Sequence, residues 1–146
     1  MNRWADDPAV RSRRLARARR WAWIWGAFLL ALTSWPSPPT VPVLSDIPSI
    51  DKIVHSILYG VEGWFLLQAI RWPGRPGPTL SRALCVIGAL AVFGTADETH
   101  QAFIPGRSME GRDAVMDTVG AAAGTSAAWI GRRRRNVGDS RGSGEG

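Results

Sequence analysis

The chain contains one cysteine and none of the short motifs that select a reaction. Because Cys85 is the only cysteine, it cannot form an intrachain disulfide, and because it lies inside an apolar run it is expected to be buried as a small hydrophobic residue. The sequence lacks a P-loop, a nucleophile elbow, an H-E-x-x-H zinc motif and a paired-cysteine motif. Whether the protein is an enzyme therefore stays open.

Charged residues are scarce in the long apolar runs and gather at the two ends and in short patches. The net charge of +6 comes largely from basic blocks at residues 11–20 and 132–135, and a third block lies at 71–82. No basic face with interleaved aromatic residues accompanies them, so nucleic acid is not expected as a partner. Beside apolar helices, these blocks indicate contact with the anionic lipid headgroups at the cytoplasmic face of a bilayer.

Four apolar runs predict an all-α protein, an integral membrane bundle of four transmembrane helices. The runs lie at about residues 21–35, 52–72, 80–102 and 113–130, and with their flanks each approaches the roughly 20 residues that cross a bilayer. Trp21, Trp23 and Trp25 stand where an interfacial aromatic belt is expected. A cleaved signal peptide is the rival interpretation of the first run, but its basic region is long and no A-x-A site follows.

These runs divide the chain into a basic cytoplasmic segment (1–20), a membrane domain (21–131) and a basic, disordered cytoplasmic tail (132–146). Five prolines in residues 36–50 exclude a helix there and predict an extended outer loop. With the three basic blocks on one side, we expect a multi-pass protein of the cell membrane, with both termini cytoplasmic and loops 36–50 and 103–112 outside. Ser49 or Asp51 is expected to cap the second helix.

The stretch from residue 97 to residue 117 places ionisable side chains between the third and fourth runs. Such groups are costly in lipid and by default mark a functional site. The predicted topology brings three distant segments to one depth at the outer face. They contribute Asp51, Lys52, His55 and Tyr59 from the second run, Asp97, Glu98, His100 and Gln101 from the third, and Arg107, Asp113 and Asp117 from the loop and the fourth.

Two further features concern the interior of the bundle. Glu62 lies near the expected bilayer centre, on the polar face of the second run, where a carboxylate must be protonated, paired or hydrated. Gly120 and Gly124 form a G-x-x-x-G on the stripe that carries the two aspartates of the fourth run. This stripe predicts close contact with another helix.

The converging residues admit three interpretations. In the structural one, Lys52 and Arg107 neutralise the carboxylates and hold the helices in register. In the binding one, the same two cations hold the phosphate or carboxylate of an anionic, lipid-linked ligand. In the enzymatic one, a histidine is the general acid or base in a reaction of a lipid-linked envelope precursor. The carboxylates then act as a base or as ligands of a divalent metal. No cofactor is predicted; the candidates are His55, Glu98 and His100 for catalysis, and Asp51, His55, Asp97 and His100 for a metal.

The order of these motifs resembles the VanZ-like family of small bacterial membrane proteins. The matching residues, over about 46–130, are Asp51-Lys52 with His55 and Tyr59, Asp97-Glu98 with His100-Gln101, Pro105-Gly106-Arg107, and Asp113 followed by Gly120 and Gly124. The family often has asparagine where this chain has Asp117. The resemblance implies a multi-span envelope protein with a link to resistance against the glycopeptide teicoplanin. The first function that we expect is an outer polar cluster that binds or excludes an anionic, lipid-linked or glycopeptide-like ligand.

Arg107 is predicted to be the positive partner of this site. It follows a Pro-Gly turn that is too short to carry it far from Asp97, Glu98 and Asp113. An arginine in an outer loop also runs against the positive-inside rule, which favours a specific partner. Arg112, in the same loop but outside the matching motif, is expected to be an ordinary surface charge.

Overall fold

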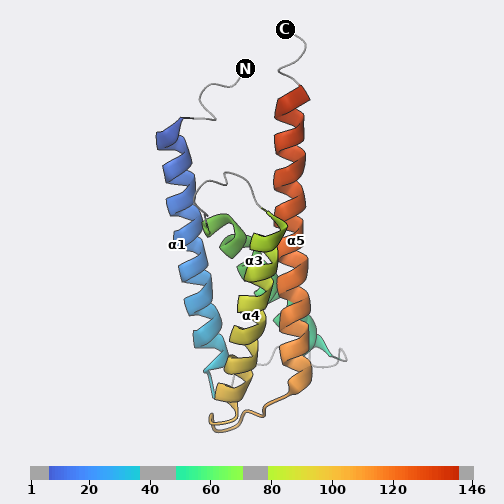
Figure 1. Ribbon diagram of the computed structural model, residues 1–146. Coiled ribbons are helices and arrows are strands. Elements are labelled where there is room, and N and C mark those ends of the chain that lie inside the picture. Colours follow the sequence, from blue (N-terminus) through green and yellow to red (C-terminus); the bar gives the residue numbers. More distant parts are fainter. Residues whose placement is uncertain (1–6, 37–48, 71–78, 142–146) are drawn as a thin grey trace.

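The computed structural model describes residues 7–36, 49–70 and 79–141, and in these ranges the protein is helical with no strands. Its helices are α1 (Pro8–Thr33), α3 (Ile50–Ala69), α4 (Leu80–Gln101) and α5 (Gly111–Arg141), which pack as an elongated bundle (Figure 1). The all-α prediction is confirmed for the described residues, and each helix covers one expected apolar run. Most of the expected loop at 36–50 and of the basic turn at 71–82 lies outside these residues.

The helix starts follow from local sequence. The Asp7 carboxylate accepts a hydrogen bond from the N–H of Ala9 at 2.8 Å, and Pro8 occupies the first turn, where its missing N–H leaves no bond unmade. Thr79 caps α4 in the same way, through the N–H of Arg82 at 3.2 Å. Ser49 occupies the cap position of α3 as expected, but it has a left-handed φ of 62° and makes no side-chain cap bond.

Two helices run beyond the expected apolar runs. α1 begins at Pro8, so the arginines of block 11–20 belong to the same helix as the first run. α5 continues to Arg141, which corrects the expected disorder for residues 132–141, while 142–146 lie outside the described range. Arginine is a good helix former, and the runs of arginine therefore extend both helices without a local barrier. Both extensions project from the same end of the bundle (Figure 1).

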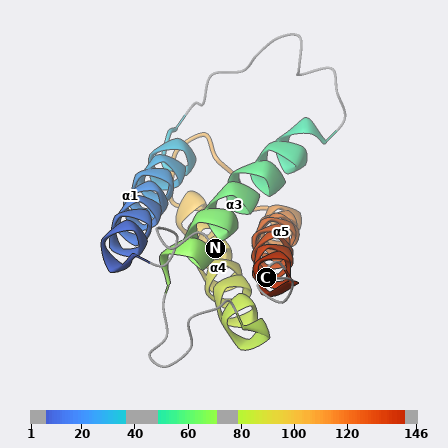
Figure 2. The same ribbon diagram turned by 90° about the horizontal axis from the view of Figure 1, so that it is seen from above.

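α3 is the helix around which the others pack. It lies between α1 and α5 when the bundle is viewed from above (Figure 2), and it packs most extensively on α5. A Cβ added at Gly124 would overlap the backbone of Gly60, and one added at Gly120 would overlap the backbone of Ser56. The prediction that these two glycines face another helix is confirmed, and that helix is α3. The absence of side chains at the crossing lets the two backbones approach closely.

Away from the polar end described below, the interior formed by the described residues is mostly apolar, and its buried polar residues include Glu62, Arg82 and Thr125. Leu29, Leu67 and Val86 are buried at the contacts between helices. Arg82, expected in a cytoplasmic turn, is only 1% exposed and donates from Nη1 to the carbonyl of Ile70 at 3.2 Å. This hydrogen bond gives the buried guanidinium a partner and also satisfies a backbone acceptor at the end of α3.

Large apolar side chains cover much of the outer surface. Trp23, Leu84 and Val92 are 81%, 59% and 72% exposed. Cys85 is exposed beside Leu84, so the prediction that it is buried is wrong. An apolar run does not reveal which of its positions turn inward when the outward positions are apolar as well.

Of the described helices, only α4 has the length and mean hydropathy of a membrane span, with a mean hydropathy of 1.5. The other three carry charges within or beside their apolar segments: the arginine blocks in α1 and α5, and the ionisable side chains of α3 and α5 at the polar end. The structure thus supports the expected bundle of four helices. By length and composition, one of these described helices could cross a membrane.

Candidate functional site

Polar side chains from all four described helices meet at one end of the bundle, opposite the arginine-rich extensions. The C-terminal ends of α1 and α4 and the N-terminal ends of α3 and α5 lie there, so the chain direction alone brings the expected segments together (Figure 1). We call the resulting group the polar cluster. Its members are Thr33, Asp51, Lys52, His55, Tyr59, Asp97, Glu98, Gln101, Arg107, Glu110, Asp113 and Asp117.

The outer part of the polar cluster is organised by one ammonium group. Lys52 Nζ lies 2.7 Å from Asp51 Oδ2, 3.2 Å from Glu110 Oε2 and 3.2 Å from Asp113 Oδ1. The hydrogen bond from Lys52 lowers the pKa of the Asp51 carboxyl below its ordinary 3.8. We call Asp51, Glu110 and Asp113 the Lys52 triad. Their side chains are 52%, 49% and 13% exposed, so this is a largely solvated group with a cation at its centre.

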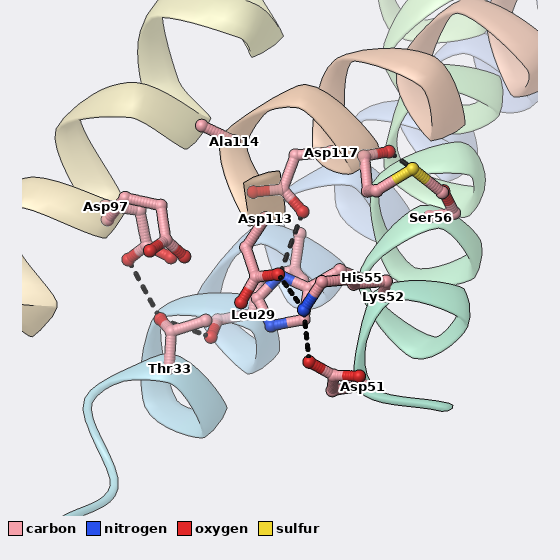
Figure 3. Close-up of polar contacts among 12 residues, drawn as sticks. Leu29, Thr33, Asp51, Lys52, His55, Ser56, Asp97, Asp113, Ala114 and Asp117 are labelled. Atoms are coloured by element: carbon pink, nitrogen blue, oxygen red, sulfur yellow. Dashed lines mark hydrogen bonds and ion pairs between the residues drawn. The ribbon is translucent and has the colours of Figure 1, made fainter. Parts of the chain in front are cut away.

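The inner part of the polar cluster has a histidine where the outer part has a lysine. His55 Nδ1 lies 2.9 Å from Asp117 Oδ1 (Figure 3), and one ligating atom each from His55, Glu98 and Asp117 lie within 4.8 Å of one another. We call these three residues the His55 triad. Glu98 and Asp117 are 1% and 0% exposed. Among the residues that the structure describes, neither carboxylate forms an ion pair with a lysine or an arginine.

Asp97 is held beside the His55 triad by neutral donors. The hydroxyl of Thr33 donates to Asp97 Oδ1 at 2.9 Å (Figure 3), and Gln101 Nε2 donates to Asp97 Oδ2 at 3.3 Å. The same amide nitrogen lies 3.2 Å from Glu98 Oε1, and the N–H of Glu110 donates to Glu98 Oε2 at 3.0 Å. Three buried carboxylates therefore lie close together and are hydrogen-bonded largely by uncharged groups.

Arg107 reaches the site through an amide and not through an ion pair. Its Nε and Nη2 donate to Gln101 Oε1 at 3.1 and 2.6 Å, and Gln101 in turn donates to Asp97 and Glu98. The predicted direct pairing with Asp97, Glu98 or Asp113 is absent among the described contacts. Gly106, with φ 81°, makes the turn that directs Arg107 back toward α4.

Tyr59 and Gly94 complete the inner wall. A Cβ at Gly94 would lie 3.2 Å from Asp117 Oδ2 and 3.4 Å from Tyr59 Cε1, so the ring and the carboxylate both lie against this glycine. Tyr59 is 1% exposed, and its hydroxyl, near Asp97, makes no well-formed hydrogen bond within the described part of the chain. The same is true of Asp117 Oδ2. Two buried polar atoms therefore face the inner cluster without a partner.

The structure separates His100 from the site. His100 is exposed, while Asp97, Glu98 and Gln101 on the same turn are buried. The four residues predicted for a metal are therefore not brought together: Asp51 lies in the Lys52 triad, Asp97 binds Thr33, and only His55 belongs to a compact buried group. The helical period places residues 97, 98 and 101 on the inward stripe and leaves position 100 outside it.

Two members of the polar cluster were not predicted from the sequence. Thr33 ends α1 and binds Asp97, and Glu110 lies in the loop before α5 and binds both Lys52 and Glu98. Both had a signal: Thr33 is a hydroxyl at the end of the first apolar run, and Glu110 is the one acidic residue in loop 103–112. Neither signal distinguishes a site residue from an ordinary surface residue.

Glu62 lies apart from the polar cluster, farther along α3. It is 7% exposed, and its Oε2 is buried without a hydrogen-bond partner in the described ranges. Its other oxygen faces α1, 3.7 Å from the position of a Cβ on Gly26. A carboxyl group in this position avoids a large desolvation cost only as the neutral acid.

The polar cluster is chemically suited to a cation. Three buried carboxyl groups, none of them in an ion pair with a lysine or arginine of the described ranges, would oppose a phosphate or carboxylate and attract a positive group when they are ionised. The His55–Asp117 pair is also the arrangement in which a carboxylate orients an imidazole for proton transfer.

Comparison with protein families matches the greater part of the chain to a known family. A profile of the VanZ/LLP1 family covers residues 8–132, which is most of the chain. The match begins well before residue 46, where the resemblance was expected to start, and so includes the arginine-rich part of α1. Searches of curated proteins and of solved structures gave no match.

Proposed function

The chain belongs to the VanZ/LLP1 family, and we propose that it is a multi-pass membrane protein of the bacterial cell envelope that presents the polar cluster at the outer face. In this proposal α1, α3, α4 and α5 all cross the bilayer. The polar cluster receives a positively charged group at its buried carboxylates. The observation that carries the proposal is the burial of Asp97, Glu98 and Asp117 together, at 4%, 1% and 0% exposure, at the end of the bundle opposite the arginines.

The distribution of side chains around the bundle supports the membrane location. Large apolar side chains are exposed on all four described helices, among them Phe28, Ile57, Val92 and Val119, which is unusual for a soluble surface and typical of a lipid-facing one. Two carboxyl groups within α3 and α5 are turned inward: Glu62 is 7% exposed and Asp117 is 0% exposed. The low mean hydropathy of these helices is therefore compatible with a crossing, because these two groups avoid lipid.

The arginines support the orientation. Those of block 11–20 in α1 and of Arg132 to Arg134 in α5 lie at one end, and the positive-inside rule puts that end in the cytoplasm. Exposed Trp21 and Trp23 follow the first block at the depth of the interface. The polar cluster then opens toward the outside, where it meets envelope components.

The charge of the polar cluster changes the expected ligand. An anionic ligand was expected from Lys52 and Arg107, but both cations are engaged, Lys52 by three carboxylates and Arg107 by Gln101. A cationic group is therefore the first occupant that we propose, and an anionic lipid-linked ligand would bind through it. We extend the proposal to the teicoplanin link: expression of the protein should lower the susceptibility of a sensitive host, and His55→Ala, which changes a residue of the family motif, should remove this protection.

A second candidate function is an enzyme acting on a lipid-linked envelope precursor. The observation in its favour is the 2.9 Å contact between His55 Nδ1 and the buried Asp117 carboxylate. In this arrangement Asp117 orients the imidazole, and His55 takes or gives the proton. Loss of turnover in His55→Ala, with binding of the precursor retained, would favour this function over simple binding.

Site-directed labelling tests the membrane proposal. In a Cys85→Ser background, single cysteines replace Ser108, which is exposed in the loop between α4 and α5, and Ser12, which is exposed in α1. A membrane-impermeant maleimide should label position 108 in intact cells and position 12 only after permeabilisation. Labelling of position 108 only after permeabilisation, or of both positions from outside, would reject the proposed topology.

A further inference from the structure

We propose that the His55 triad binds one divalent metal ion, through an imidazole nitrogen of His55 and one carboxylate oxygen each from Glu98 and Asp117. This inference deepens the proposed function, on which it rests, by naming the cation that the polar cluster receives. It also replaces the metal-ligand set expected from the sequence, of which only His55 remains.

The distances within the triad fit the edges of a metal coordination shell. Nδ1 of His55 and Oδ1 of Asp117 are already 2.9 Å apart, and all three ligating atoms lie within 4.8 Å of one another. Two ligands that bind a tetrahedral ion at about 2.1 Å lie about 3.4 Å apart. A small inward movement of the Glu98 carboxylate would therefore close the site around an ion.

The charge of the triad calls for a cation. Glu98 and Asp117 are 1% and 0% exposed and make no ion pair with a lysine or arginine in the described ranges. Burying two carboxylates without compensation is strongly unfavourable. A divalent ion balances both charges in one step, which a single histidine cannot do.

Two buried atoms without partners point to the same place. Asp117 Oδ2 and the Tyr59 hydroxyl make no well-formed hydrogen bond among the residues described, although Asp117 is 0% and Tyr59 1% exposed. The Asp117 carboxylate and the Tyr59 ring both lie against Gly94, so these atoms face one small region. A bound ion would coordinate Asp117 Oδ2 directly or through a metal-bound water. A metal-bound water would also form a hydrogen bond with the Tyr59 hydroxyl.

The surroundings also hold the carboxylate ligands in place. The N–H of Glu110 donates to Glu98 Oε2 at 3.0 Å, and Gln101 Nε2 donates to Glu98 Oε1 at 3.2 Å. Each carboxylate oxygen keeps a second lone pair for a metal. Arg107 fixes the Gln101 amide from the other side, at 2.6 Å from its oxygen. Such outer-shell hydrogen bonds orient metal ligands in known sites.

The ligand set indicates the class of ion. One imidazole and two carboxylates suit Zn²⁺ or Mn²⁺ better than Mg²⁺ or Ca²⁺, which prefer oxygen alone, and the absence of a thiolate disfavours Cu(I). The Lys52 triad is not a second site of this kind, because the ammonium of Lys52 already lies 2.7–3.2 Å from all three of its carboxylates.

The experiment uses the full-length protein in detergent, stripped with EDTA and titrated separately with ZnCl₂ and MnCl₂. Bound metal is measured by mass spectrometry after desalting, and helix content by circular dichroism. We expect one equivalent of Zn²⁺ per chain, with Mn²⁺ competing. His55→Ala should lose this equivalent, and His100→Ala, which removes the exposed histidine, should keep it.

A second pair of variants compares the two triads: Asp117→Asn should lose the bound metal, and Asp51→Asn should keep it. The inference is overturned if folded wild-type protein binds no stoichiometric Zn²⁺ or Mn²⁺, or if His100→Ala loses as much metal as His55→Ala. Wild-type titration decides the matter even where a variant does not fold. Absence of metal together with outside labelling of position 108 would reject the metal site alone, whereas bound Zn²⁺ with inside labelling would reject the proposed topology alone.

Discussion

The Lys52 triad and the His55 triad are neighbouring groups of similar chemistry with opposite ways of balancing charge. The Lys52 triad lies at the surface, with Asp51 and Glu110 about half exposed, and an ammonium from the chain itself lies at its centre. The His55 triad is buried, and the chain supplies a titratable imidazole in place of a permanent cation. We infer that the deeper group is the one that would receive an external cation, because solvent cannot screen its carboxylates.

The largest effect is expected where the His55 triad depends on the contact between two helices. Gly124→Leu places a side chain into the backbone of Gly60 and must push α3 away from α5, which separates His55 from Asp117. We expect a loss of about 3 kcal/mol in the free energy of unfolding, measured as a lowered Tm in detergent. Zn²⁺ binding should be lost with it.

The control for this prediction is Ala123→Leu, one position earlier on the same helix, where the side chain is exposed. Its effect on Tm should be small. Lys52 and Asp51 are adjacent in sequence, so their contact should outlast the separation of the helices in Gly124→Leu. Equal loss of Tm in both leucine variants would contradict the idea that the α3–α5 contact assembles the inner triad.

A medium effect is expected at Arg107, which contacts Gln101 and through it Glu98 of the His55 triad and Asp97 beside it. Arg107→Lys removes the forked pair of hydrogen bonds to Gln101 Oε1, and lysine cannot restore both. The Gln101 amide would then hold Glu98 less firmly, and we expect an affinity for Zn²⁺ lower by about 10-fold. Isothermal titration would measure it.

Arg112→Lys is the matched control, because Arg112 is exposed in the same part of the chain and lies outside the family motif. It should bind Zn²⁺ as the wild type does. Arg107→Lys could instead lower the Tm equally with and without EDTA treatment and leave the affinity for Zn²⁺ unchanged. In that case the arginine would stabilise the fold and would not support the metal site.

The smallest effect is expected from Lys52→Met, which removes the ammonium group that lies between the three carboxylates of the Lys52 triad. The wild type should be more stable than the variant at neutral pH, because it keeps the ion pairs of Lys52. The difference should be small, because solvent screens half-exposed carboxylates. The folded pKa of Asp51 is lowered by Lys52, so this advantage is complete above 3.8 and is lost as the pH falls through the folded value. Thermal unfolding of both proteins from neutral to strongly acid pH measures the difference.

An advantage of the wild type that grew on acidification would contradict this assignment. Zn²⁺ binding provides a separate check at neutral pH, where Lys52→Met should leave the stoichiometric site at His55 unchanged. A second equivalent of Zn²⁺ in Lys52→Met would show that the lysine occupies a cation site that is otherwise equivalent to the inner one.

Much of the architecture could be predicted from the sequence because helix-forming apolar runs are local features. The four runs became the four described helices, and Gly120 and Gly124 met α3 as their spacing indicated. The convergence of polar residues at one end followed from the alternating direction of the helices. The extent of α5 was underestimated, since the Arg-rich stretch after residue 131 is helical to Arg141.

Which polar side chains meet could not be predicted from spacing alone. His100 and Glu98 are two positions apart on α4, yet one is exposed and the other is 1% exposed. Cys85 and Val86 show the same contrast among apolar neighbours. The period of a helix relates its own residues to one another, but it does not specify how that helix is rotated against its neighbours.

The sequence by itself determined the helices, the small-residue face of α5 and the end of the bundle at which charge gathers, because each depends on residues close together along the chain. Only the tertiary structure decided that Lys52 serves Asp51, Glu110 and Asp113, that Arg107 acts through Gln101, and that Thr33 joins Asp97. These pairings depend on the rotation and crossing of α1, α3, α4 and α5. That packing, and not the order of residues within any one helix, leaves His55, Glu98 and Asp117 together in the interior.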